Sequence, residues 1–254
     1  MKRFTLLFVI IMACTGISHA QILITLLFGD KLNSPNIEFG LHAGANISTL
    51  SNIEGAKYVS NLNLGFFFDF RLSDKWSFHP EVLVKSTSGA KGLQTYEVGD
   101  PELDQLLIGS DLERQIGYIQ VPILIKYKLK YGFGIEGGIQ PALRTSVYDV
   151  FTDEIFEKDD FRFKNNIKSD FTSLDFGLTA GISWRPGKDQ KGMTIIARFT
   201  LGLVDILKDN PGKPQKNRAF AVGALIPIGV KKAEAARIEK EANENGEEKA
   251  DQEK

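Results

Sequence analysis

Apolar residues alternate with polar residues or glycine in eight segments of the chain after residue 36. In the first of them, Ile37, Phe39 and Leu41 alternate with Glu38, Gly40 and His42. The eight segments are 37–46, 62–72, 76–85, 119–128, 133–140, 174–185, 193–203 and 220–228. A period of two is typical of a β-strand whose two faces meet different surroundings. The pattern therefore predicts an all-β fold with eight strands.

The lengths of the strands and of their connections point to a membrane barrel. A strand of about 11 residues rises about 36 Å, and a tilt near 40° leaves a vertical reach of about 28 Å, which is close to the apolar band of an outer-membrane barrel. Longer connections alternate strictly with short ones, as outer loops and periplasmic turns do in such barrels. The longer ones are 47–60, 88–115, 146–170 and 205–217, and the short ones are 73–75, 130–131 and 186–191.

A soluble, lipocalin-like barrel is the alternative, with an apolar lumen and a polar exterior. One face of the predicted strands is apolar and carries almost no charge. The other face is rich in glycine and in charges of both signs, which suits a narrow lumen in which opposite charges pair. Trp76, Tyr127, Phe133 and Trp184 lie near strand ends, as the residues of an aromatic girdle do. We therefore predict an eight-stranded antiparallel up-and-down transmembrane β-barrel.

Four motifs resemble the PorT-like outer-membrane β-barrel family over roughly residues 36–230. They are GLHAGANIS at 40–48, FHPEVL at 78–83, YIQVPILIKY at 118–127 and Asn217-Arg218. The resemblance implies an eight-stranded barrel in a Gram-negative outer membrane with both chain ends in the periplasm. The family's namesake takes part in protein secretion, but most members have no assigned activity, so a role in secretion is an alternative function.

The N-terminus has the form of a secretory signal peptide. Lys2 and Arg3 precede an apolar run, and Ser18-His19-Ala20 places small residues at the cleavage site. We expect a signal peptide at 1–20, a periplasmic segment at 21–35 and the barrel at 36–230. Two alternatives remain: a lipoprotein acylated at Cys14, or an uncleaved anchor over 4–28. Cys14 is the only cysteine, which excludes intramolecular disulfides and cysteine-based metal sites.

Residues 231–254 differ in composition from the barrel. They hold 14 charged residues among 24 and no aromatic residue, and their first half favours a helix. We expect a solvated, partly helical periplasmic tail, with a docking helix for a periplasmic or secretion-system protein as the alternative. The other expected partners are outer-membrane lipid and the barrel-insertion machinery. Because the net charge of the chain is −1, nucleic acid is not an expected partner.

The inward face carries charges that predict a salt-bridged, closed lumen. They are Glu38, Asp69, Arg71, Glu81, Lys85, Lys126, Glu136, Arg144, Asp175 and Arg198. An eight-stranded barrel has just enough interior for side chains, so we expect paired charges to fill it. A gated ion path is the alternative. The expected function is a structural or interaction scaffold.

Two inward histidines raise the question of chemistry. His42 and His79 can be combined on paper with nearby serines and carboxylates, but no nucleophile motif surrounds those serines. The histidines also lack a recognised metal-ligand spacing. We therefore expect no catalytic, cofactor or metal site, and keep a lipid-modifying enzyme as the alternative. Pro80 and Pro122 fall within strands, where they predict bulges or missing ladder bonds.

Overall fold

The computed structural model describes residues 33–34, 36–156, 159–187 and 192–228. The strands are β1 (Ile37–Leu50), β2 (Val59–Arg71), β3 (Trp76–Leu93), β4 (Asp111–Gln120), β5 (Ile123–Lys128), β6 (Phe133–Phe156), β7 (Asp159–Asn166), β8 (Leu174–Trp184), β9 (Thr194–Gly202) and β10 (Asn217–Pro227). The helical segments are α3 (Pro101–Leu106) and the 3-10 turns η2 (Lys130–Gly132) and η3 (Lys168–Asp170). Within the described ranges, none of these helices is long and apolar enough to cross a bilayer. The expected signal peptide and charged tail lie outside the described residues.

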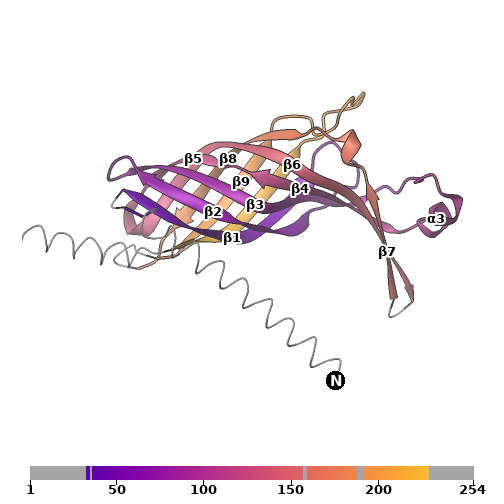
Figure 1. Ribbon diagram of the computed structural model, residues 1–254, viewed down its shortest axis with the longest axis horizontal. Helices are drawn as coiled ribbons and strands as arrows, with labels where there is room; N and C mark the ends of the chain where they lie inside the picture. The colour runs from indigo at the N-terminus through magenta and orange to yellow at the C-terminus, as the bar shows by residue number, and fades with distance from the viewer. Residues whose placement is uncertain (1–32, 35, 157–158, 188–191, 229–254) are drawn as a thin grey trace, which may run out of the picture. The chain divides into compact units, whose positions relative to one another are not determined.

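The strands close into a ring with antiparallel pairing. Around the ring the order is β1, β2, β3, β4 with β5, β6, β8, β9, β10 and back to β1. β4 and β5 share one position because each pairs with both β3 and β6. β7 lies off this path and pairs with β6 (Figure 1). The prediction of an all-β, eight-stranded antiparallel barrel is confirmed, with one of its strands divided in two.

Proline explains the division between β4 and β5. The two strands are separated by Val121 and Pro122, and proline has no backbone N–H for a ladder bond. The chain is held there by the Glu81 N–H, which donates to the Pro122 carbonyl at 2.8 Å. The interruption expected at Pro122 is thus present. Pro80 lies within β3, where it is paired with Ile123 and causes no shift of register.

Two irregularities change which residues of a strand face inward. In β3, Leu83 is buried, but after a register shift the buried positions are Ser86 and Ser88. In β6, Arg144 is buried, but beyond the next shift Val147 is buried instead. Each irregularity moves the alternation by one residue, because the side-chain period of a strand is two.

The two longest connections are more ordered than the sequence indicated. β3 continues to Leu93 and β4 begins at Asp111, so the connection between them is residues 94–110 and contains α3. Most of 146–170, expected as a loop, is instead the hairpin formed by the end of β6 and β7. Pairing satisfies the backbone groups of this hairpin. α3 and β7 lie at the same end of the barrel in Figure 1, which we call the long-loop end. The opposite end is the short-turn end.

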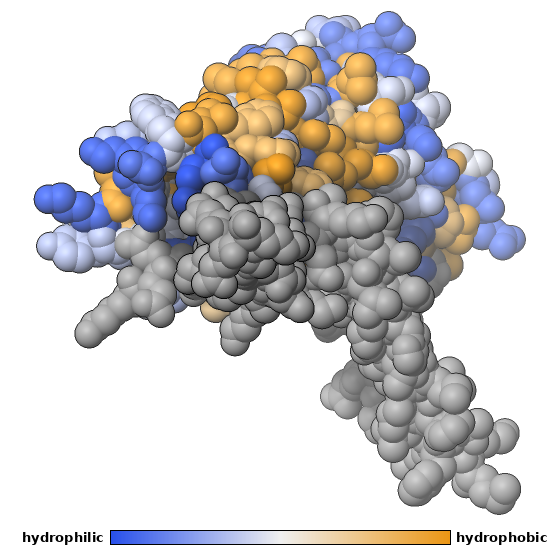
Figure 2. All heavy atoms as spheres, turned by 60° about the vertical axis from the view of Figure 1, so that its left-hand side comes forward, coloured by the Kyte–Doolittle hydropathy of each residue, from blue (hydrophilic) through white to orange (hydrophobic). Residues whose placement is uncertain are grey.

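The outward face of the barrel is apolar. Exposed residues of this face include Val82, Ile125, Ile135, Ile139, Leu178, Ile182, Phe199, Leu201, Phe220 and Val222. Figure 2 shows apolar side chains gathered between hydrophilic regions on one face. The expected girdle residues form pairs at the short-turn end, where the Trp76 and Tyr127 rings lie 4.7 Å apart and the Phe133 and Trp184 rings 6.1 Å apart. Such a belt suits contact with lipid.

The chain divides into two compact units, Gly40–Ile226 and a smaller one made of Met1–Phe39 with Pro227–Lys254. In the described part of the smaller unit, the Asn33 side-chain amide donates to the Ile228 carbonyl at 2.6 Å. The Phe39 N–H donates to the Asn33 amide oxygen at 2.9 Å, and the Ile228 N–H donates to the Phe39 carbonyl at 3.0 Å. These bonds tie the start of β1 to the residue after β10.

Candidate functional site

The candidate site is a group of buried polar side chains inside the barrel, centred on Glu81 of β3. Its carboxylate is fully buried. One oxygen, Oε2, lies 2.7 Å from His42 Nδ1 of β1. The other, Oε1, accepts from Arg198 Nη2 of β9 at 2.7 Å and lies 2.8 Å from His79 Nε2. Three strands are therefore joined through one carboxylate.

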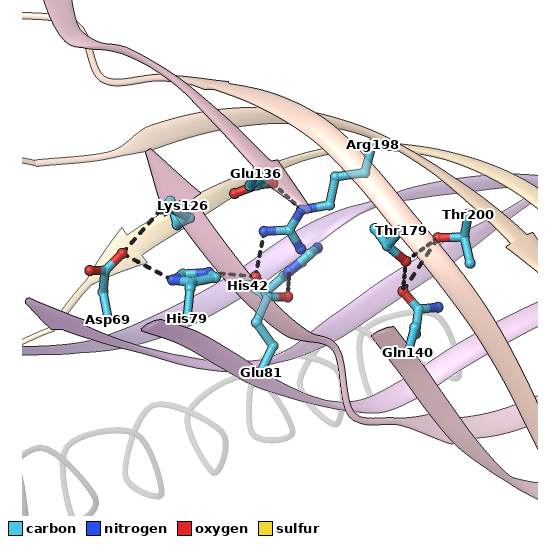
Figure 3. Close-up of polar contacts among 10 residues, drawn as sticks. All are labelled: His42, Asp69, His79, Glu81, Lys126, Glu136, Gln140, Thr179, Arg198 and Thr200. Atoms are coloured by element: carbon cyan, nitrogen blue, oxygen red, sulfur yellow. Dashed lines mark hydrogen bonds and ion pairs between the residues drawn. The ribbon is translucent and has the colours of Figure 1, made fainter. Parts of the chain in front are cut away.

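Two further carboxylates extend the group. Asp69 Oδ2 of β2 lies 3.0 Å from His79 Nδ1 and 3.2 Å from Lys126 Nζ of β5. On the other side, Arg198 Nε donates to the Glu136 carboxylate of β6. Figure 3 shows these side chains converging from the surrounding strands. We call the set of His42, Asp69, His79, Glu81, Lys126, Glu136 and Arg198 the lumen network.

The local sequence makes room for the lumen network. Phe67 of β2 is fully buried beside it, and its ring stacks on the His79 ring with 5.4 Å between centroids. A Cβ atom on Gly40 of β1 would overlap that phenylalanine ring, so the glycine allows the close approach. Because a charge buried alone is costly, the mutual pairing of the acidic and basic groups is what makes this filling stable.

Other polar groups continue the inward face toward the long-loop end. Gln140 of β6 accepts from Thr179 of β8 at 3.0 Å, and Thr200 of β9 lies 2.9 Å from Thr179 (Figure 3). Farther on, the Asn217 side-chain amide donates to both the Asp175 carboxylate at 2.6 Å and the Tyr118 hydroxyl at 3.0 Å. Each of these contacts involves at most one charged group, whereas the lumen network consists mainly of ion pairs.

Of the ten charged residues predicted for the lumen, five meet in the lumen network. They are Asp69, Glu81, Lys126, Glu136 and Arg198. Arg144 and Asp175 lie on the inward face but apart from it: Arg144 Nε donates to the Thr172 carbonyl at 2.7 Å, and Asp175 accepts from Asn217. Glu38 is half-buried in the smaller unit.

The other two predicted lumen residues are exposed, and the prediction was wrong for them. Lys85 follows the irregularity of β3, which turns its side chain outward and places Ser86 inside. Arg71 is the last residue of β2, where the strand leaves the barrel for the short turn. Strict alternation places both residues inward, because it includes neither strand irregularities nor strand ends.

Sequence reasoning missed part of the site. In the sequence, His42 and His79 suggest only enzyme or metal chemistry, although they lie on the same strand faces as the predicted charges. Among the described residues, no group of three or more His, Cys, Asp or Glu has an arrangement that could hold a metal ion. Instead, His79 bridges the carboxylates of Asp69 and Glu81, and His42 contacts that of Glu81.

An apolar cluster fills the barrel at the long-loop end. Its buried members are Leu50, Ala90, Leu93, Leu107, Leu112, Ile116, Tyr118, Ala142, Val147, Phe151, Phe171 and Ile206. We call this set the outer core. Residues of the long connections, such as Ile53, Val98 and Leu207, pack against it. The sequence pattern did not indicate this core, because many of its residues come after the irregularities of β3 and β6 or from the connections.

One ion pair borders the outer core. Arg114 of β4 donates to both carboxylate oxygens of buried Asp149 of β6, at 2.8 and 2.7 Å, and lies over the Phe171 ring at 5.3 Å. With Tyr96 and Leu207 these residues line a cavity of about 250 Å³. Burial, and then the charge of Asp149, raise the pKa of Tyr96 to about 12.

A closed antiparallel barrel with an apolar outward belt and a polar lumen defines an outer-membrane β-barrel protein. Residues 30–208 match the family model described as outer membrane protein beta-barrel domain, and the chain belongs to this family.

Among solved structures, the chain is similar to the attachment invasion locus protein Ail of Yersinia pestis (10% identity, 76% of this chain and 99% of that chain covered, TM-score 0.41). It is also similar to Neisserial surface protein A (12% identity, 74% and 96% covered, TM-score 0.41). A third similar structure is OprG of Pseudomonas aeruginosa (15% identity, 76% and 93% covered, TM-score 0.31). No curated protein matches the sequence.

Proposed function

We propose that this outer-membrane barrel is a closed structural or interaction scaffold that acts through its long connections and not through a channel. The observation that carries the proposal is the filling of the lumen at two levels. Arg198 lies between two buried carboxylates in the lumen network, and the outer core fills the barrel beyond it. An eight-stranded barrel has an interior only about as wide as its side chains, so two filled levels support a closed lumen.

Conductance measurements test this proposal. The purified protein, inserted into planar bilayers, should show no steady conductance at neutral pH. The Arg198→Ala variant is the matched comparison, since it removes one cation from the lumen network and leaves the outer core in place. Insertion is verified by resistance of the barrel to protease. Stable, reproducible channels of the wild-type protein would contradict the proposal and favour the gated ion path.

We further propose that the protein is not an enzyme. His42 and His79 are buried inside the barrel, and each is bonded to a carboxylate of the lumen network, so neither is accessible to a lipid at the outer surface. The test compares lipid hydrolysis by the wild type with that of the His42→Gln and His79→Gln variants. A wild-type activity that both variants lose would overturn this proposal.

A component of a protein-secretion machinery is a narrower form of the scaffold. The PorT-like motifs support it, and the charged tail at 231–254 supplies a segment that a periplasmic protein could bind. Crosslinking in intact cells, with and without the tail, tests this role. Reproducible tail-dependent crosslinks to one periplasmic protein are expected for a machine part, whereas a barrel that acts alone gives none.

The proposed topology places the short turns in the periplasm and the long connections outside the cell. It rests on the alternation of short and long connections, and on export through a cleaved signal peptide that leaves Gln21 as the first residue. Protease added to whole cells should cut within 94–110 and spare the turn at 73–75. Cleavage at that turn with protection of 94–110 would invert the topology, and N-terminal sequencing tests the cleavage site.

A further inference from the structure

The two ring nitrogens of His79 each lie within hydrogen-bond distance of a carboxylate. Nδ1 is 3.0 Å from Asp69 Oδ2, and Nε2 is 2.8 Å from Glu81 Oε1. A neutral imidazole has one N–H and one lone pair, whereas an ionised carboxylate can only accept. Both contacts can therefore be hydrogen bonds to ionised carboxylates only if His79 carries a proton on each nitrogen.

The alternative is a neutral histidine beside a protonated carboxylic acid, and the surrounding contacts disfavour it. Asp69 also accepts a hydrogen bond from Lys126 Nζ, and Glu81, which lies 2.7 Å from His42 Nδ1, also accepts one from Arg198. Each of these donors stabilises the ionised form of its carboxylate. The proton is therefore better held by the histidine than by either acid.

The charges of the lumen network lead to the same assignment. Asp69, Glu81 and Glu136 supply three negative charges, and Lys126 and Arg198 supply two positive charges. One further positive charge makes the buried network neutral. His42 contacts one carboxylate through Nδ1 alone, and a neutral ring with its proton on Nδ1 satisfies that contact.

We propose that His79 is an imidazolium ion at neutral pH and that its proton holds the lumen network together. The groups that face it are Asp69 and Phe67 from β2 and Glu81 from its own strand; His42, Lys126, Glu136 and Arg198 complete the surroundings from β1, β5, β6 and β9. Loss of the proton leaves a ring lone pair facing a carboxylate and one excess negative charge. The pairing within the lumen network weakens when this proton is removed, whereas the outer core is unaffected.

Proton exchange should occur from the short-turn end. The side chains of Asp69 and Lys126 are 17% and 12% exposed, whereas those of His79 and Glu81 are fully buried. The outer core fills the barrel on the other side of the network. In the proposed topology, the lumen network therefore responds to the pH of the periplasm and is shielded from the pH outside the cell.

Nitrogen NMR of histidine-labelled protein in detergent at pH 7 tests the protonation states, with the His42→Gln variant used to assign the signals. We expect both nitrogens of His79 to be protonated and His42 to be neutral with its proton on Nδ1. Asp69→Asn is the matched variant: it removes one negative charge, so His79 should become neutral. A neutral His79 in the wild type overturns the proposal, and an imidazolium in both proteins overturns the charge-balance argument.

Denaturant unfolding at pH 7 supplies the second readout. His79→Gln should lower the unfolding midpoint more than His42→Gln, because glutamine offers a donor to one carboxylate but turns its oxygen toward the other. Equal midpoints for the two variants would contradict a central role for the His79 proton. Since these experiments report protonation and stability, their failure is distinguishable from failure of the closed-scaffold function, which conductance tests.

Discussion

The barrel is filled in two different ways at its two ends. The lumen network joins six of the eight strand positions through charged groups and histidines with specific partners, such as Glu81 with Arg198. The outer core is filled by apolar side chains such as Ile116 and Phe171, whose packing has no fixed partners. The loss of one member should therefore leave unpaired charges in the first region and a cavity in the second.

The largest effect is expected from Arg198→Ala. This change removes the cation between Glu81 and Glu136, and breaking a buried pair in this way costs roughly 3–5 kcal/mol of unfolding free energy. The measurement is urea unfolding of the protein in detergent or lipid. Lys85→Ala is the matched control, because Lys85 has the same predicted role but is exposed, and should change the midpoint little. An equal fall of the unfolding midpoint in both variants would contradict the conclusion that Arg198 is a paired lumen residue and Lys85 an exposed one.

A smaller effect is expected in the outer core. Ile116→Ala leaves a cavity in a fully buried position, with a cost of roughly 2–5 kcal/mol that falls as neighbours relax into the space. Because the long connections pack on this core, their protease sensitivity should rise in the same variant. Ile108→Ala is the control, since Ile108 is 77% exposed in the connection after α3. If the Ile116 variant unfolds and is cleaved like the control, the outer core does not support these connections.

The same contrast shows how much the sequence could predict. Alternation indicated the strands, the apolar belt and an inward face with Glu81, Glu136 and Arg198, because lipid on one side and a lumen on the other impose a period of two. It failed at Lys85, since a strand irregularity has no clear sequence signature. The outer core, which includes Leu107 and Ile206 from the long connections, depends on tertiary packing that no local pattern reports.

The pairing of His79 with two carboxylates illustrates a further limit. The sequence places His79 and Glu81 on one face of a strand, but the contact with Asp69 depends on how β2 and β3 are paired. Register across strands fixes which inward groups meet, and the strand faces alone do not. The composition of the lumen was therefore predictable in part, and its specific partners were not.

The smallest effect concerns Tyr96, at the border of the outer core. Its hydroxyl accepts from the Asn165 amide at 3.0 Å, and burial together with the charge of Asp149 raises its pKa to about 12. An unfolded tyrosine ionises near pH 10, so between about pH 10 and 12 the unfolded state loses this proton first and stability falls as pH rises. Because Tyr96 is 38% exposed, solvent screens much of the interaction and the change is small.

The ultraviolet absorbance of phenolate, taken as the difference between the wild type and Tyr96→Phe during an alkaline titration, measures this group alone. We expect a midpoint near 12 in the wild-type background and a lower midpoint in Asp149→Asn, where the neighbouring negative charge is removed. A wild-type midpoint near the ordinary value of about 10 would show that Tyr96 does not pack against the outer core. An unchanged midpoint in Asp149→Asn would instead mean that burial alone raises the pKa of Tyr96. The shift would then depend on packing near the outer core and not on Asp149, which forms the ion pair with Arg114.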